Sequence, residues 1–365
     1  MKKIKISELK AGMTLNNSIQ CDFSYKTLLP KGTKLTRLHL EKLKNINPEG
    51  YCFIIEPEDL KGISLETLDK VNNEGVKRAF LDSYITGKSI YQNLACGNPI
   101  NIKFAYETVD LLTEQLLSHC SLMLQLAAVK VIDEYSFSHM VNVAIYASSF
   151  ARSLNYSPNA IKDICLAGIL HDIGKAKIPQ DILQKPGKLT EEEFEIIKRH
   201  PKLGYDELNK IQELKEHVRQ AVLQHHERAN GSGYPLGLKG KEISLYSQVI
   251  SIADFYDALT SDRCYRGRVL PHEAAEILMG SSSLNDFDIE LVRLFLKNIT
   301  LYPIGTEVVL NTGQRARVVH IPVDFPLRPT LQIMEPDGLD QWIPAGRLEL
   351  LKETTVFITS IISCS

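Results

Sequence analysis

The chain has 365 residues, a formal net charge of −2, 44% hydrophobic residues and 24% charged residues. These fractions are ordinary for globular proteins, so a fibrous or fully disordered chain is excluded, and the length allows two or three domains. The near-neutral charge argues against charge-driven binding to DNA, to RNA polymers or to an anionic membrane.

The cysteines and the apolar stretches bear on the cellular compartment. The seven cysteines are Cys21, Cys52, Cys96, Cys120, Cys165, Cys264 and Cys364. They form no Cys-x-x-Cys pair, so neither a disulfide framework nor a thiolate zinc site is expected, and a reducing compartment is the natural interpretation. No signal peptide and no apolar run of membrane-spanning length is visible. The sequence therefore predicts a cytoplasmic protein.

Residues 1–77 predict a small β-rich domain followed by a connector. Short β-like runs lie at Lys3–Ile6 and Gly50–Ile55, and a short helix is expected at Thr36–Asn45. The polar, charged stretch Pro57–Lys77 is the expected connector.

Residues 78–298 are dominated by helical patterns. One segment without Pro or Gly carries the recurring apolar residues Leu112, Leu116, Leu117, Leu124 and Val131. Further on, Thr190-Glu-Glu-Glu193 has the Thr-x-x-Glu signature of a capped helix start. These patterns predict an all-helical domain as the body of the protein.

Residues 299–365 return to a β-like pattern. Strands are expected at Glu307–Leu310, Ala316–His320 and Thr330–Met334, with turn signals at Asn311–Gly313 and Pro336–Gly338. The predicted fold class is therefore mainly α, with β-rich regions at both ends.

Five histidines and two aspartates continue the apolar stripes of the predicted helices. They are His139, His171, Asp172, His200, His225, His226 and Asp254. Residues three or four apart share a helix face, so these side chains are expected to point inward. Burying so many ionisable groups without partners is costly, and metal ions bound by neutral imidazoles and carboxylates remove that cost.

Each of these residues also has an ordinary interpretation. A single histidine on an apolar face is usually a hydrogen-bonded core residue, and Asp254 near a helix end is often a cap or an ion-pair partner. The adjacent pairs His171-Asp172 and His225-His226 favour metal binding. Neighbours on a helix point about 100° apart, so both reach one site only if it lies along the helix flank. Two ions that share Asp172 satisfy that geometry.

Four motifs follow one another in the helical region. They are His171-Asp-Ile-Gly-Lys175, His200-Pro201, His225-His-Glu-Arg228 with Gly231-x-Gly233-Tyr-Pro235, and Ala253-Asp254-x-x-Asp257 continuing to Arg263. This ordered set resembles the HD-GYP phosphodiesterase family over residues 100–298. The resemblance implies an all-helical HD-type metal hydrolase domain that hydrolyses cyclic di-GMP to pGpG, and in many members onward to GMP.

The resemblance also implies a ligand set for two divalent metal ions. One ion would be held by His139, His171, Asp172 and Asp254, and the second by Asp172, His200, His225 and His226. Nitrogen and oxygen ligands without Cys suit iron or manganese, with zinc, nickel or cobalt as alternatives. Some members hold a third ion through a Glu four residues before the first His. Tyr135 stands there, so a binuclear site is expected.

Two metal ions suit phosphodiester hydrolysis, because a water that bridges them becomes hydroxide near neutral pH and attacks a phosphate whose charge they neutralise. Lys175 would contact the scissile phosphate, or only cap a helix end. Arg263 and Arg266 would hold the phosphates, or remain solvated surface charges. Asp257 would orient the nucleophile or protonate the leaving oxygen, or else align a ligand histidine.

The Gly-Tyr-Pro loop is first of all a turn. The resemblance assigns Gly233, Tyr234 and Pro235 to the substrate pocket. Two residues depart from the family pattern: Asn230 stands where Asp is common and can still bond the local backbone, and Cys264 stands where Pro is usual, which alters backbone stiffness more than chemistry.

Three functional hypotheses remain on sequence alone. The first is a cyclic di-GMP phosphodiesterase, the second a hydrolase of another cyclic dinucleotide such as cyclic GMP-AMP, and the third a non-catalytic binding module. The intact ligand series and Lys175 favour an enzyme. The N-terminal region resembles a small domain often found ahead of HD-GYP domains, where contacts in a homodimer or with signalling proteins stay open. The C-terminal extension shows no catalytic motif and is expected to cap the core.

Overall fold

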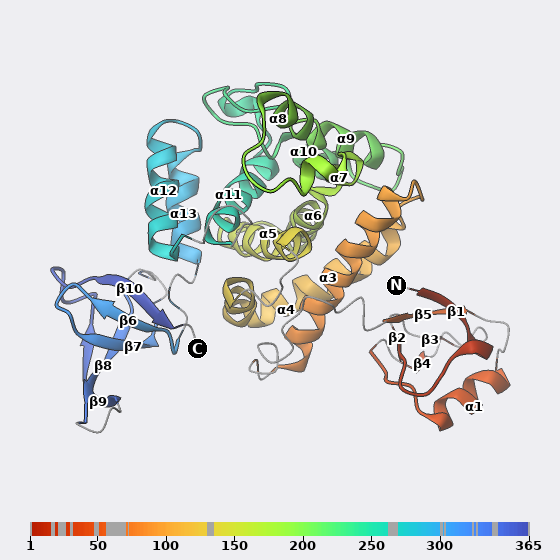
Figure 1. Ribbon diagram of the computed structural model, residues 1–365, viewed down its shortest axis with the longest axis horizontal. Helices are drawn as coiled ribbons and strands as arrows, with labels where there is room; N and C mark the ends of the chain where they lie inside the picture. The colour runs from red at the N-terminus through yellow and green to blue at the C-terminus, as the bar shows by residue number, and fades with distance from the viewer. Residues whose placement is uncertain are drawn as a thin grey trace.

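The computed structural model places a helical body between two β-rich regions (Figure 1). It describes residues 2–363 except 16–18, 21–26, 30–31, 47–50, 56–70, 72, 130–134, 262–268, 300–301, 303, 323–324, 326–327 and 338–341. This architecture confirms the expected fold class of a mainly helical protein with β-rich ends.

The N-terminal region has its own small core. Strands β1 (Lys2–Lys5), β2 (Thr14–Leu15) and β5 (Tyr51–Ile55) form an antiparallel sheet in the order β1-β5-β2, and β3 (Ile19–Gln20) pairs with β4 (Thr27–Leu29). A 3₁₀ turn η1 (Ile6–Glu8) and helix α1 (Arg37–Ile46) complete the region. The buried residues are Ile6, Leu9, Leu15, Leu35 and Leu43. The expected strands and helix are confirmed.

The expected connector ends earlier than predicted. Helix α3 (Glu74–Ala95) begins inside Pro57–Lys77, and the Asn73 side chain caps it by accepting a hydrogen bond from the Val76 amide at 3.0 Å. Asparagine is a strong N-cap residue, and this start signal is what the sequence interpretation missed. Residues 56–70 of the connector lie outside the described part of the chain.

The helical body continues through a long series of helices. They are α4 (Ile102–Val129), α5 (Tyr135–Ser153), α6 (Pro158–Leu170), η3 (Ile173–Lys177), α7 (Gln180–Leu183), α8 (Glu191–Ile197), α9 (His200–Leu208), α10 (Glu216–Gln224), η4 (Gly240–Glu242), α11 (Leu245–Thr260), α12 (Pro271–Ser283) and α13 (Ile289–Asn298). The predicted apolar segment lies in α4, although Val131 falls outside the described residues and His119 interrupts the helix with φ −135° and ψ 44°. The capping box at Thr190 is confirmed at the start of α8.

Two glycines allow close contacts that position the later site. A Cβ added at Gly168 on α6 would lie 2.6 Å from the Cα of Ala144 on α5, so only hydrogen fits between these helices. A Cβ at Gly174 on η3 would collide with the carbonyl oxygen of His200 and would lie 2.5 Å from the Gly204 amide nitrogen. The backbones of η3 and α9 are therefore in direct contact.

The C-terminal region is a five-stranded antiparallel sheet in the order β10-β6-β7-β8-β9. Its strands are β6 (Glu307–Leu310), β7 (Arg315–His320), β8 (Thr330–Pro336), β9 (Trp342–Glu349) and β10 (Ile358–Ser363). The first three are the predicted strands. The pattern missed β9 because it is largely exposed and contains Pro344 and Gly346. Inward residues such as Val308 and Val318 belong to the same core as the helices, and α12 and α13 lie beside this sheet (Figure 1).

Among the described residues, none of the helices combines the length and the apolar character that crossing a bilayer requires.

Candidate metal centre

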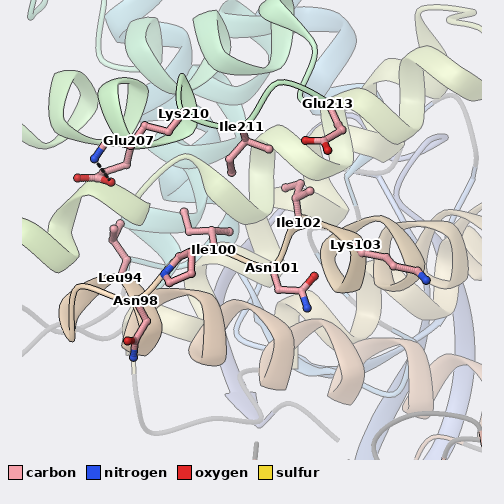
Figure 2. Close-up of a pocket in the computed structure, with 11 residues that line it drawn as sticks. Leu94, Asn98, Ile100, Asn101, Ile102, Lys103, Glu207, Lys210, Ile211 and Glu213 are labelled. Carbon is pink, nitrogen blue, oxygen red and sulfur yellow. Dashed lines mark hydrogen bonds and ion pairs between the residues drawn. The ribbon is translucent and has the colours of Figure 1, made fainter.

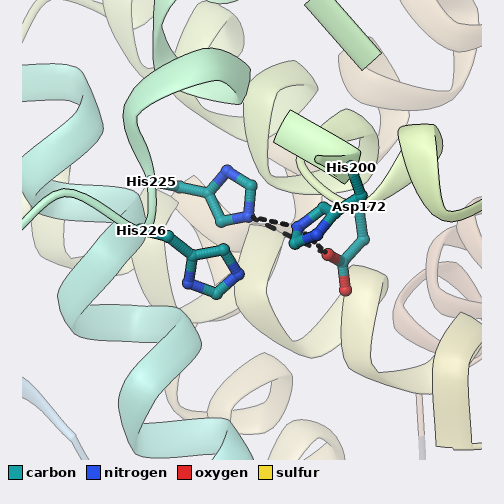
Figure 3. Close-up of side chains that lie close together, drawn as sticks. All are labelled: Asp172, His200, His225 and His226. Atoms are coloured by element: carbon teal, nitrogen blue, oxygen red, sulfur yellow. Dashed lines mark hydrogen bonds and ion pairs between the residues drawn. The ribbon is translucent and has the colours of Figure 1, made fainter. Parts of the chain in front are cut away.

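The seven predicted ligands come together in two neighbouring groups. The His139 group consists of His139, His171 and Asp254, and the His200 group consists of Asp172, His200, His225 and His226. Within each group, one potential ligand atom per residue lies within 4.8 Å of all the others. Figure 3 shows the His200 group, in which His225 and His226 from the end of α10 face His200 and Asp172.

The adjacent pairs lie at helix ends and not along helix flanks, which corrects the sequence interpretation. His171 directly follows α6, and His225 directly follows α10, so His171-Asp172 and His225-His226 occupy the turns after these helices. In these turns both residues of each pair belong to the cluster. Helix C-termini also carry partial negative charge, which favours a nearby cation.

Three histidines are fixed in the same way. The Nδ1 atoms of His171, His200 and His225 lie 2.7, 2.8 and 2.7 Å from the carbonyl oxygen of the residue three positions earlier. A carbonyl oxygen only accepts, so each Nδ1 must carry the proton and donate it. Each Nε2 is then left with a lone pair directed into the cluster, which is the form that binds metals.

His139 is held by a carboxylate. Its Nδ1 lies 2.7 Å from Oδ2 of Asp257, whose side chain is fully buried. The other bonds of Asp257 come from the Asn142 amide at 3.1 Å and the Ser261 hydroxyl at 3.1 Å. With its oxygens engaged in this way, Asp257 is placed to align His139 and not to act directly on substrate. The geometry therefore supports the aligning role among the alternatives that the sequence left open for Asp257.

Asn142 and Ser261 were missed by the sequence interpretation. They stand three residues after His139 and four residues after Asp257, so their helical spacing was the available signal.

The His200 group contains lone pairs that no proton satisfies. The Nε2 atoms of His200 and His225 lie 3.3 Å apart, and the buried Oδ1 of Asp172, which accepts no hydrogen bond, lies 3.2 Å from His200 Nε2. Burial lowers the pKa of both histidines, well below its usual value for His225, although Asp172 opposes the shift. Metal–ligand bonds of about 2.0–2.2 Å separate neighbouring ligand atoms by roughly 3 Å. These residues therefore fit a divalent cation.

The His139 group differs because a proton already lies in it. His139 Nε2 is 3.0 Å from Oδ1 of Asp254 and 3.3 Å from Nε2 of His171. Burial lowers the pKa of His139, but hydrogen bonds to Asp254 and Asp257 outweigh it and raise the pKa to about 9. Burial likewise opposes ionisation of Asp254, and the hydrogen bond from His139 still holds its pKa well below the usual value. A cation here would replace that proton.

Asp172 faces both groups. Its Oδ2 lies 3.3 Å from His171 Nε2, while its Oδ1 lies 3.2 Å from His200 Nε2. Lys175 Nζ lies 2.6 Å from Oδ2, and its side chain is partly exposed. Burial would raise the pKa of Asp172, but Lys175 and His171 hold it well below its usual value. The carboxylate is thus ionised, with one oxygen available to each group.

The Gly-Tyr-Pro loop lies against the His200 group. The Tyr234 ring is 4.7 Å from the His226 ring at 31° and 6.5 Å from the His200 ring. A Cβ at Gly233 would collide with the Arg228 amide nitrogen, so glycine is required there, and Pro235 follows through a cis peptide bond. Tyr234 therefore borders the His200 group, next to Gly233 and Pro235.

Some of the residues singled out in the sequence lie outside the described part of the chain. Arg263, Arg266 and Cys264 lie outside the described residues, and so does the side chain of Tyr135, although its backbone begins α5. Asn230 bonds the local backbone as expected, because its Oδ1 accepts from the Ser232 amide at 2.9 Å.

A cavity of about 570 Å³ lies away from these residues, between the α3–α4 corner and the α9–α10 corner. Leu94 and Ile100 point toward Ile211 across it, with Glu207 and Glu213 at its edges (Figure 2). It contains none of the predicted site residues. The cavity is therefore separate from the histidine and aspartate cluster.

Comparisons with known proteins agree with the motifs. A family model described as an HD domain matches residues 110–291, and one described as a KOW domain associated with HD domain matches residues 307–365. The chain is 37% identical over 227 residues to a cyclic di-GMP phosphodiesterase of Pseudomonas aeruginosa, covering 62% of this chain and 54% of that protein. It is 33% identical over 250 residues to a cyclic di-GMP phosphodiesterase of Thermotoga maritima, covering 67% and 64%.

A third relative has a different stated substrate. The chain is 35% identical over 194 residues to 3'3'-cGAMP-specific phosphodiesterase 1 of Vibrio cholerae, covering 52% of this chain and 43% of that protein. The chain spans about half the length of the Pseudomonas relative.

A solved structure shares the fold. It is an HDG"Y"P protein from Bdellovibrio bacteriovorus, with a TM-score of 0.53 and 19% identity, covering 81% of this chain and 98% of that one. Together with the HD domain match and the named relatives, the ordered His-Asp and Gly-Tyr-Pro motifs show that this chain belongs to the HD domain family, in its HD-GYP branch.

Proposed function

We propose that this protein is a metal-dependent phosphodiesterase that hydrolyses cyclic di-GMP to pGpG, with GMP as the product of a second cleavage. The observation that carries the proposal is the Asp172 carboxylate, which turns one oxygen toward each group of histidines. Relatives named cyclic di-GMP phosphodiesterases support the choice of substrate. The scattered cysteines are in keeping with action in the cytoplasm.

Two divalent cations would occupy the cluster, iron or manganese by the ligand chemistry. His139, His171 and Asp254 would hold one ion, His200, His225 and His226 the other, with Asp172 shared between them. When bound, the ions would activate a water molecule and neutralise the phosphate that it attacks.

The chain itself contributes orientation and charge. Asp257 and the three backbone carbonyls fix the imidazole rings, so each Nε2 is directed inward before any ion arrives. Lys175 is partly exposed beside Asp172. Its ammonium group can therefore bind a phosphate oxygen once the Asp172 carboxylate coordinates the metal ions. The Tyr234 ring offers a flat face bordering the cluster, against which a base can stack. Arg263 and Arg266 would add phosphate contacts.

The test is to strip the protein of metal, reload it anaerobically with Fe(II) or Mn(II), and incubate each form with cyclic di-GMP. Chromatography of the products should give pGpG, or GMP, only from the reloaded protein. If the reloaded protein contains two ions per chain and leaves cyclic di-GMP intact, this substrate assignment is wrong.

A second substrate, cyclic GMP-AMP, is favoured by the similarity to the Vibrio cholerae enzyme specific for it. The two dinucleotides share the phosphodiester ring and differ in one base, so the metal cluster cannot distinguish them. Parallel assays with both substrates measure the ratio of kcat/KM values. A ratio that favours cyclic GMP-AMP would move the chain to the second specificity while leaving the phosphodiester chemistry in place.

A further inference from the structure

The segment that follows the metal-binding histidines folds back onto them. After His226 the chain passes through the Gly-Tyr-Pro loop and returns to the body at η4 and α11. The Tyr234 amide donates to the carbonyl oxygen of His226 at 3.2 Å, and the Tyr234 ring packs against the His226 ring. The position of this loop therefore decides where Tyr234 lies relative to the cluster.

One buried carboxylate holds the far side of the loop. Glu227, the residue after His226, has 2% of its surface exposed. Its Oε1 accepts from the Leu236 amide at 2.7 Å, and its Oε2 accepts from the Leu238 amide at 2.9 Å. Bonds from backbone amides to a charged acceptor are stronger than bonds between neutral groups. Two of them close the loop immediately after Pro235.

The base of the loop is fixed as well. A Cβ at Gly233 would lie 2.5 Å from the Cα of Glu227, so the loop rests on the backbone of the residue that anchors it. The neighbouring Arg228 donates to the Ser251 hydroxyl at 2.7 Å and lies 4.7 Å from the centre of the Phe287 ring. Ser251 is on α11, the helix that supplies Asp254. The anchor is therefore continuous with the frame of the metal cluster.

We infer that Glu227 is a positioning residue for substrate binding, which acts through the Leu236 and Leu238 amides to hold Tyr234 beside the cluster. Both carboxylate oxygens are engaged by the loop, and Glu227 belongs to neither group of metal-binding residues. Its role is distinct from that of a metal ligand and from that of a group touching the phosphate. The kinetic part of this inference rests on the proposed phosphodiesterase function, whereas the anchoring does not.

Glu227→Gln is the sharpest variant because it keeps the shape of the side chain. Glutamine retains one oxygen, but its amide nitrogen is a donor that would face a second backbone donor. Glu242→Gln is the matched control: Glu242 also accepts from a backbone amide near the loop, that of Lys239 at 2.8 Å, but its side chain is exposed and caps η4.

The first measurement is amide hydrogen exchange. Exchange at Leu236 and Leu238 should be faster in Glu227→Gln than in the unaltered protein, and unchanged in Glu242→Gln. Unchanged protection of both amides in Glu227→Gln would overturn the inference. Hydrogen exchange is measured without substrate turnover. A protein that hydrolyses no cyclic dinucleotide would refute the proposed function, but exchange at Leu236 and Leu238 would still decide whether Glu227 anchors the loop.

The second measurement separates positioning from general damage. In Glu227→Gln the KM for cyclic di-GMP should rise about tenfold, because misplacing a substrate contact weakens binding and orientation. The metal content and the rate with bis(4-nitrophenyl) phosphate, too small to need the loop, should change much less.

A double-variant cycle then tests whether Glu227 affects KM through Tyr234. Once Tyr234→Ala has removed the ring, adding Glu227→Gln should raise KM no further, since residues that act through one contact are not additive. Fully additive effects, or an equal loss with the small diester, would show that Glu227 does not act by placing Tyr234.

Discussion

The two halves of the candidate metal centre, the His139 group and the His200 group, contain similar side chains but differ in where their protons lie. In the His139 group a proton shared between His139 and Asp254 stabilises the buried charges, and the pKa of His139 rises to about 9. In the His200 group the pKa values of His225 and His226 are well below their usual value, because burial and neighbouring imidazoles disfavour their charge. One half is therefore satisfied without metal, and the other is left with facing lone pairs.

For the proposed pair of ions, this difference predicts unequal binding. A cation entering the His200 group would meet imidazoles that are already neutral and an ionised Asp172, whereas one entering the His139 group would displace a proton. The His200 group should thus bind metal over a wider pH range.

Asp172→Ala should have the largest effect because its carboxylate faces both groups. We expect loss of both ions and a fall in activity of more than about a hundredfold, since even the loss of a residue that only supports a ligand costs up to that much. Metal analysis after reloading, together with the rate on cyclic di-GMP, measures this. Asp181→Ala, at an exposed position on α7, is the control and should retain both ions. Two bound ions in Asp172→Ala would contradict a shared carboxylate.

Asp257→Asn should affect the two halves differently. Asp257 aligns His139 alone, so the ion in the His139 group should bind about ten- to a hundredfold more weakly while the other is retained. Chelator titrations followed by metal counts resolve the two ions. Ser261→Ala removes one hydrogen bond to Asp257 but keeps its charge, so its effect should be smaller. Equal weakening of both ions would show that the halves are not separable.

Acidity should distinguish the halves without any substitution. Below about pH 9 His139 is mostly protonated in the metal-free protein, so metal affinity of its group should rise with pH, by up to about tenfold per unit, and level off above that pKa. Affinity of the His200 group should stay flat through neutral pH because His225 and His226 are already neutral. Calorimetric titrations in buffers of different ionisation enthalpy count the protons released. If binding of each ion released the same number of protons, the two groups would not differ in protonation as described.

How well the sequence predicted each part depends on the kind of signal. Helical periodicity indicates which face of a segment is buried, and it indicated that all seven ligands point inward. It carries no information on where a helix ends, so the pairs at His171 and His225 were expected on helix flanks, whereas the structure places them in the turns after α6 and α10. The role of Asp257 depended on Asn142 and Ser261, contacts that only the folded helices create.

The flanking regions show the same limit. The predicted strands of the C-terminal sheet have alternating buried residues, and β6 has this pattern clearly, with Val308 and Leu310 buried. Strand β9 is exposed along nearly its whole length and is held by backbone pairing with β8, which leaves no hydrophobic pattern to detect. In the same way, close backbone contacts at glycines leave no trace in hydrophobic patterning, although the contact at Gly174 brings η3 against the start of α9, where His200 lies.

Gly174→Ala tests that contact and should have the smallest effect on metal binding. A methyl group at Gly174 would collide with the carbonyl oxygen of His200, so η3 and α9 must separate. We expect a loss of about 1–3 kcal/mol in the free energy of unfolding, as for overpacked sites, and weaker binding by the His200 group, because η3 follows Asp172 and α9 begins at His200.

Gly280→Ala is the matched control for this prediction. Gly280 also lies within a helix, α12, but a Cβ there meets no atom within 4 Å, so the change should be neutral or stabilise by up to about 1 kcal/mol. Denaturant unfolding of the metal-free proteins isolates the packing cost, and metal titration then measures the effect on each ion. If Gly174→Ala weakened the His139 group as much as the His200 group, then η3 would carry strain to both halves through Asp172, and the two sites would behave as one coupled unit.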